Sequence, residues 1–88
     1  MSKIEVYSSL FCPYCARAKN FLKNRGLDFT EIDVDESPAE RIEMTKRAHG
    51  RTSVPQIFFD GKSIGGSDDL VALENSGELE LLLMSTGE

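Results

Sequence analysis

The chain has 88 residues, of which 40% are hydrophobic and 28% charged, and this composition is typical of one globular domain spanning residues 1–88. Its net charge of −5 argues against a nucleic-acid-binding protein, which would normally present a basic surface. No apolar run reaches the length of a membrane span, and Met1-Ser2-Lys3 leads directly into a predicted strand without the apolar block of a signal peptide. We therefore expect a cytoplasmic monomer without nucleic-acid or membrane partners.

The first two predicted elements flank the only two cysteines of the chain. Alternating apolar residues predict a strand over residues 3–7, and apolar residues at helical spacing predict a helix over 13–25. Gly26 supplies the stop signal for that helix. Cys12 then occupies the helix N-cap, and Pro13 takes the first helical position, where its missing N–H costs nothing.

This placement predicts a dithiol redox centre. A Cys12 thiol at the N-cap faces unpaired backbone N–H groups and the positive end of the helix dipole, and both stabilise a nucleophilic thiolate. Cys15 lies on the same side of the first turn and could close a disulfide with Cys12. In a reducing cytoplasm such a pair is catalytic or metal-binding rather than structural. A structural zinc ion is usually bound by about four Cys or His ligands, and this chain has only His49 besides its two cysteines. We therefore expect no bound metal.

A second strand and helix follow. The strand is predicted over about residues 28–34. Ser37 is the predicted N-cap of a helix that runs to about Ala48, because Pro38 follows it and Glu40 completes a capping box.

A hairpin and two helices complete the chain. The segment 51–59 contains a strand preceded by Pro55, and Asp60-Gly61 predicts a two-residue turn to a returning strand over 62–65. Ser67 is the predicted N-cap of a third helix, which Gly77 ends before a short final helix over 78–84.

The predicted order is β-α-β-α-β-β-α-α. Two strands joined through a helix should be parallel with a right-handed crossover, whereas a hairpin adds an antiparallel pair. The expected fold is therefore α/β and thioredoxin-like, with a four-stranded mixed sheet flanked by helices.

Three segments of the sequence together resemble the signatures of one family. Cys12-Pro13-Tyr14-Cys15, Ser53-Val54-Pro55 and Gly65-Gly66-Ser67-Asp68-Asp69 resemble, in this order, those of dithiol glutaredoxins, most closely the small bacterial members. The resemblance covers nearly the whole chain. Thioredoxins carry tryptophan before a Cys-Gly-Pro-Cys centre, and this chain has no tryptophan.

The resemblance implies a glutathione-dependent thiol–disulfide oxidoreductase that acts on disulfide-containing or glutathionylated proteins. In this interpretation Cys12 attacks the substrate disulfide and Cys15 resolves the intermediate. Glutathione is the reducing cosubstrate, and no bound cofactor is required. Two alternatives remain open, namely a thioredoxin-like reductase served by a flavoenzyme and a carrier of a glutathione-ligated iron–sulfur cluster.

The same resemblance implies where glutathione binds. A cis peptide bond before Pro55 places the Val54 backbone beside the cysteines, where it can pair with an extended peptide. Arg51 corresponds to the basic residue that reaches the glycine carboxylate of glutathione. Tyr14 corresponds to one wall of the binding groove. Ser67 and Asp68 correspond to the pair of residues that holds the γ-glutamyl end of glutathione.

One position departs from the family pattern. Members commonly carry a lysine three residues before the first cysteine, and this chain has Ser9 there. Arg17 or Lys19 on the first helix are candidates to supply the missing positive charge.

Overall fold

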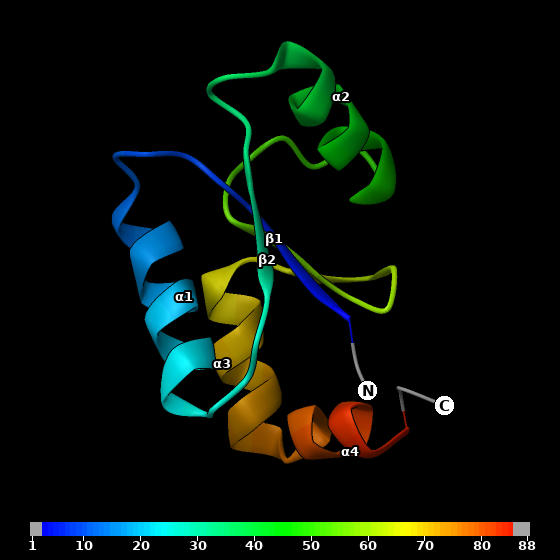
Figure 1. The fold of residues 1–88 in the computed structure, drawn as a ribbon. Coiled ribbons are helices and arrows are strands. Elements are labelled where there is room, and N and C mark those ends of the chain that lie inside the picture. Colours follow the sequence, from blue (N-terminus) through cyan, green and yellow to red (C-terminus); the bar gives the residue numbers. More distant parts are fainter. Residues whose placement is uncertain (1–2, 86–88) are drawn as a thin grey trace.

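The computed structural model describes residues 3–85, so both ends of the predicted domain 1–88 lie outside the described residues. The elements follow the predicted order (Figure 1). They are β1 (Ile4–Ser8), α1 (Pro13–Asn24), β2 (Thr30–Asp33), α2 (Pro38–Arg47), β3 (Gln56–Phe59), β4 (Lys62–Gly65), α3 (Ser67–Ser76) and α4 (Glu78–Ser85). Within residues 3–85, no helix is both long enough and apolar enough to cross a membrane.

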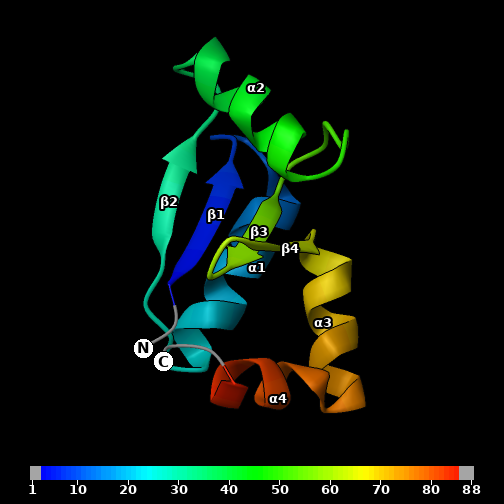
Figure 2. The same cartoon turned by 90° about the vertical axis from the view of Figure 1, so that its right-hand side faces the viewer.

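The four strands form one mixed sheet in the order β2-β1-β3-β4 (Figure 2). β1 and β2 are parallel, as expected for strands joined through a helix, and β3 pairs antiparallel with both β1 and β4. These pairings confirm the predicted α/β fold. β2 is shorter than predicted, because only residues 30–33 adopt strand geometry.

Helices cover both faces of the sheet, because alternate residues of the central strands are apolar on opposite sides. One face packs against α1, α3 and α4, and α2 covers the other (Figure 1). The core on the first face comprises Ile4, Val6, Ala18, Leu22, Ile57, Phe59, Leu70 and Leu79. The core on the second face comprises Tyr7, Val34, Met44, Ala48 and Phe58.

Arg47 fastens α2 to the sheet. Its guanidinium lies 4.3 Å from the centre of the Phe58 ring and donates hydrogen bonds to the Tyr7 hydroxyl and to both carboxylate oxygens of Glu5. The Glu5 and Arg47 side chains are both largely buried, so this ion pair is better shielded from water than those at the surface.

The predicted caps of the first two helices are confirmed. Cys12 is the N-cap of α1 in extended geometry, followed by Pro13 at the first helical position. The Ser37 hydroxyl accepts the Glu40 N–H at 3.3 Å at the start of α2. The cap positions at these helix starts were therefore readable from short polar residues followed by proline.

The start of α3 differs from the prediction. Ser67 was the predicted N-cap, but Gly66 occupies that position and Ser67 is the first helical residue. The reason is that the Asp69 carboxylate reaches back and accepts the Gly66 N–H at 2.8 Å, which satisfies the helix start from within the first turn. A side chain at position 66 would approach the Pro55 carbonyl oxygen to 3.2 Å, so this position favours glycine.

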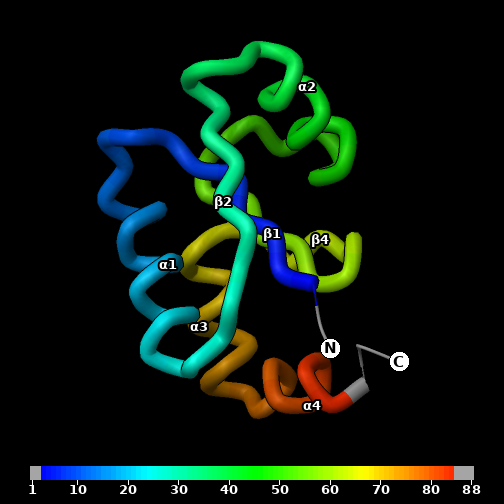
Figure 3. The backbone as a smooth tube through the Cα atoms, viewed as in Figure 1, coloured from blue at the N-terminus to red at the C-terminus, as the bar shows by residue number. Residues whose placement is uncertain are grey.

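Three segments far apart in the sequence meet near the N-terminus of α1. The backbone trace brings together the start of α1, the loop before β3 and the start of α3 (Figure 3). These three segments carry the three sequence signatures, so the fold gathers them at one place.

Candidate functional site

The Cys12 sulfur is held at the N-terminus of α1. The N–H of Cys15 donates to the Cys12 Sγ at 3.2 Å, and that sulfur lies 3.8 Å from the carbonyl oxygen of Val54. The Val54–Pro55 peptide bond is cis, as the family resemblance implied. Cys12 is partly exposed, so its sulfur combines the N–H contact from Cys15 with access to an incoming disulfide.

Cys15 has a different environment. The residue is only 1% exposed. Burial first, and then the hydrogen bond with Cys12, raises the pKa of the Cys15 thiol to about 12. The two thiols are therefore inequivalent, because the partly exposed one can meet a substrate while the buried one stays protonated.

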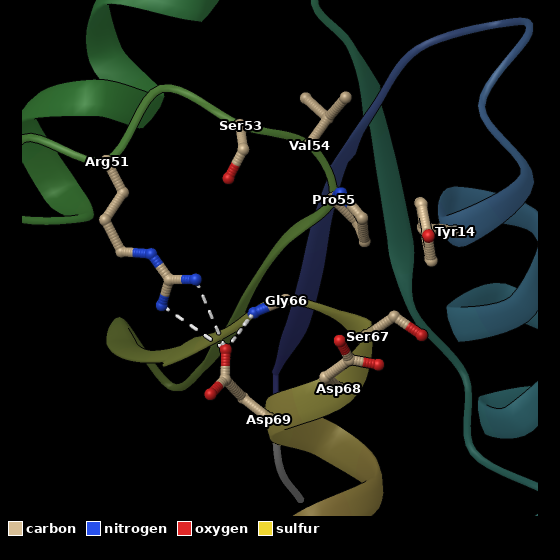
Figure 4. A pocket seen from close by; sticks show the side chains of 9 residues that line it. All are labelled: Tyr14, Arg51, Ser53, Val54, Pro55, Gly66, Ser67, Asp68 and Asp69. Carbon is tan, nitrogen blue, oxygen red and sulfur yellow. Dashed lines mark hydrogen bonds and ion pairs between the residues drawn. The ribbon is translucent and has the colours of Figure 1, made fainter.

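A groove of about 320 Å³ lies beside Cys12. Arg51 and Tyr14 stand at its two ends, with the loop through Val54 along one side and the start of α3 along the other (Figure 4). Its volume is at the small end of the range for small-molecule sites. The lining residues are Tyr14, Arg51, Ser53, Val54, Pro55, Gly66, Ser67, Asp68 and Asp69.

The groove thus brings together every sequence-predicted binding residue. Tyr14 comes from α1, Arg51, Val54 and Pro55 from the loop before β3, and the remaining two from α3. The reactive sulfur joins them through its contact with the Val54 carbonyl.

Arg51 is held by an acidic residue across the groove. Both terminal nitrogens of Arg51 lie 3.3 Å from the same Asp69 oxygen, which also accepts the Gly66 N–H (Figure 4). A side chain at Gly65, where φ is +115°, would collide with the Asp69 carboxylate. Gly65 and Gly66 therefore leave space for the Asp69 carboxylate, which orients Arg51.

The start of α3 offers further polar groups. Asp68 is exposed and forms a loose ion pair with Arg17 of α1 at 3.6 Å. The buried Ser67 hydroxyl has no hydrogen-bond partner among the residues that the structure describes. First-turn N–H groups at this helix start suit a carboxylate, and Asp68 suits an ammonium group.

Ser9, at the position where the family resemblance implies a lysine, binds an acidic residue. Its hydroxyl donates to the Asp35 carboxylate at 2.7 Å, and the Leu10 N–H donates to the same oxygen at 3.0 Å. These two bonds, led by that from Leu10, hold the pKa of Asp35 below its ordinary value. Arg17 lies 3.6 Å from the Asp68 carboxylate and Lys19 lies 2.7 Å from the Glu31 carboxylate, so each of these cations shares its charge with an acidic residue.

The sequence patterns did not predict the contacts that Asp69 and Asp35 make in this region. The Gly66-x-x-Asp69 spacing, an N-cap followed by an acid three residues later, could have indicated the back-bonding carboxylate. No local signal indicated Asp35, because its contact with Ser9 depends on the parallel pairing of β1 and β2, which brings distant residues together.

Comparison with known proteins identifies close relatives. The glutaredoxin family model matches residues 4–64. Glutaredoxin 3 of Escherichia coli is 51% identical over 83 residues, which cover 94% of this chain and 99% of that protein. The solution structure of glutaredoxin from Brucella melitensis shares 47% identity over 92% of this chain and 87% of that one, with a TM-score of 0.79. The crystal structure of the buckwheat glutaredoxin–glutathione complex has a TM-score of 0.84 at 28% identity, covering 94% and 77% of the two chains.

Proposed function

The chain belongs to the glutaredoxin family and is a glutathione-dependent thiol–disulfide oxidoreductase, and we propose that Cys12 is its nucleophile and Cys15 its resolving thiol. The observation that carries this assignment is the 3.2 Å bond from the Cys15 N–H to the Cys12 sulfur at the helix start, beside the groove. That bond favours negative charge on Cys12, whereas burial keeps the Cys15 thiol protonated.

A protein disulfide is reduced in two exchanges. The Cys12 thiolate attacks one substrate sulfur, the substrate S–S bond breaks, and the leaving thiolate takes a proton from water. Cys15 then loses its proton and attacks the Cys12 sulfur, which releases the second substrate thiol and forms a Cys12–Cys15 disulfide. Two glutathione molecules reduce that disulfide and leave as oxidised glutathione, so the electrons balance.

The timing of the second exchange follows from the inequivalence of the thiols. Burial is the largest cause of the raised pKa of Cys15, and the hydrogen bond with Cys12 and the charge of Cys12 raise it further. Once Cys12 is tied up in a mixed disulfide, it no longer carries that charge. Ionisation of Cys15 then becomes easier at the step that needs it.

A glutathionylated protein requires only Cys12. The thiolate takes the glutathionyl group, and the protein thiol leaves. A second glutathione then attacks the Cys12–glutathione disulfide and regenerates the Cys12 thiolate, with oxidised glutathione as the product.

The groove supplies the glutathione contacts in this proposal. Arg51, oriented by Asp69, would hold the glycine carboxylate, since a guanidinium suits that anion. The Val54 backbone would pair with the extended peptide beside the reactive sulfur. At the other end, the first-turn N–H groups and the Ser67 hydroxyl would bind the γ-glutamyl carboxylate while Asp68 binds its ammonium. Tyr14 would form the wall next to the sulfur.

We further propose that the protein acts as a cytoplasmic monomer on disulfide-containing or glutathionylated proteins. The net charge of −5 disfavours self-association. The glutathione dependence of the family supports a reducing compartment such as the cytoplasm. Size-exclusion chromatography with light scattering would report the mass in solution.

The deciding assay is reduction of the mixed disulfide between glutathione and mercaptoethanol, coupled through glutathione reductase to NADPH oxidation. We expect turnover by the native chain and none by Cys12→Ser. Turnover supported by thioredoxin reductase in place of glutathione, or activity retained in Cys12→Ser, would contradict the proposal.

A further inference from the structure

Two large apolar side chains stand in solvent directly before the reactive cysteine. Leu10 is 74% exposed and Phe11 is 91% exposed, and we call this pair the apolar shelf. Neither residue lines the glutathione groove. The shelf therefore extends the surface around Cys12 beyond the site already described.

The loop that carries the apolar shelf is held in place by hydrogen bonds. The Asp35 carboxylate accepts the N–H of Leu10 at 3.0 Å and the hydroxyl of Ser9 at 2.7 Å, which ties the loop to the segment that follows β2. A contact surface that is already ordered loses less conformational entropy when a partner binds. Exposed aromatic side chains on such surfaces supply much of the affinity of protein contacts.

The chemistry of Cys12 specifies what can cover the shelf. A substrate sulfur must reach Cys12, so the chain on either side of that sulfur passes over the residues around Cys12. A mixed disulfide of glutathione and a small thiol places its peptide in the groove and has nothing to lay on the shelf. A peptide or protein disulfide brings chain on both sides of its cysteine, and an apolar residue there can bury against Phe11.

We propose that the apolar shelf selects peptide and protein disulfides that carry an apolar residue next to the attacked cysteine. This inference rests on the proposed function. In the selected reaction a Cys12–peptide disulfide forms, the peptide disulfide breaks, and the second peptide sulfur leaves and is protonated by water. Cys15 then displaces the peptide and closes the Cys12–Cys15 disulfide, which glutathione reduces.

The test uses two synthetic peptides with one internal disulfide each, identical except that leucine or asparagine flanks both cysteines. Neither residue adds charge, so the comparison isolates apolar contact. We expect the native protein to prefer the leucine peptide by about tenfold in kcat/KM, as partial burial of two apolar side chains would give. Phe11→Ser should reduce this preference to about twofold, and Phe11→Leu should retain most of it.

Leu81→Ser is the matched control. Leu81 is 64% exposed on α4, which lies at the opposite end of α1 from the shelf loop (Figure 1). This variant should keep the tenfold preference. The proposal is overturned if Phe11→Ser keeps the full preference for the leucine peptide. It is also overturned if Phe11→Ser loses rate equally on both peptides and on the glutathione–mercaptoethanol disulfide. Absence of turnover of that small disulfide by the native protein would instead contradict the proposed function.

Discussion

The main-chain N–H of Cys15 donates to the sulfur of Cys12 at 3.2 Å, while the thiol of Cys15 is itself buried. Cys15 therefore supports the nucleophilic sulfur of Cys12 through its backbone N–H, and its own thiol is available to resolve the mixed disulfide. This relationship follows from the spacing of two residues between the cysteines at a helix start, where the N-cap side chain accepts from the N3 N–H.

Alkylation should distinguish the two thiols. At pH 7, iodoacetamide should modify Cys12 in the reduced native protein and leave Cys15 intact, because Cys15 is buried and its pKa is about 12. Peptide mapping by mass spectrometry would locate the label. Both cysteines should react in guanidinium chloride, which serves as the control, and equal labelling of the native thiols would contradict the assigned roles.

Removing the resolving thiol should separate the two reactions. Cys15→Ser should retain removal of glutathione from a glutathionylated protein and lose most reduction of protein disulfides, because only the second route needs an internal attack. The two rates should be measured in parallel with the same glutathione-coupled readout. If both fell equally in Cys15→Ser, the one-thiol route proposed for glutathionylated substrates would be wrong.

Local patterns were sufficient for most of the fold. Proline and short polar residues marked the starts of α1 and α2, and Asp60-Gly61 marked the hairpin between β3 and β4. The parallel pairing of β1 and β2 followed from the connecting helix. The assignment of Ser67 as a cap failed because a serine before acidic residues matches the local pattern, whereas the backbone path past Pro55 favours glycine at position 66.

The sequence predicted which residues make up the site, but not the contacts that hold them in place. The three signatures contain every residue that lines the groove except Arg51, which the family resemblance indicated separately. The contact of Asp69 with Arg51 and that of Asp35 with Ser9 join residues 18 and 26 positions apart. Such contacts depend on tertiary packing, so no periodic or turn pattern encodes them.

Asp68 should influence substrate affinity more than turnover. Asp68→Ala removes a charge that would face a remote ammonium in the ground and transition states alike, so KM should rise while kcat changes little. Since Asp68 is exposed, the loss should be about 1 kcal/mol or less, at most roughly fivefold. Arg17→Ala should lower KM slightly, because Arg17 competes for the same carboxylate. An unchanged KM in Asp68→Ala would leave this residue only its role at the helix start.

The Glu5–Arg47 pair should make folding stability depend on pH. The hydrogen bond from Arg47 is the largest cause that holds the pKa of Glu5 below its ordinary value of 4.5. The pair therefore stabilises the fold fully above about pH 4.5, and this contribution is lost as the pH falls through the lower native pKa. Glu5→Gln should cost about 1–3 kcal/mol of unfolding free energy at pH 7 and progressively less in acid.

Urea unfolding of the native chain and Glu5→Gln between pH 2 and pH 7 would measure this difference. Glu43→Gln, on an exposed position of the same helix as Arg47, is the control and should change stability little at any pH. A constant difference between the native chain and Glu5→Gln across the pH range would exclude ionisation of Glu5 as its cause.

The last prediction concerns Ser9, which stands where the family resemblance implies a lysine. A lysine at this position would bring a positive charge toward both the Cys12 sulfur and a bound glutathione carboxylate. At several ångströms in a largely aqueous setting such a charge is worth roughly 1 kcal/mol, or about fivefold. Ser9→Lys should therefore accelerate alkylation of Cys12 and lower the KM for glutathionylated substrate. Both effects should fade toward 1 M salt, where the Debye length is about 3 Å.

Asp35 limits the size of these effects, because the carboxylate that now accepts the Ser9 hydroxyl would also attract the new ammonium group. Neutralising it should release the lysine, so the double variant Ser9→Lys, Asp35→Asn should exceed Ser9→Lys in both alkylation rate and affinity. Asp35→Asn alone is the control, since the asparagine carbonyl can still accept the Leu10 N–H and keep the loop in place. If both lysine variants matched their serine counterparts in alkylation and KM, local charge would not tune this thiol. The N–H groups at the start of α1 would then have to account for its reactivity.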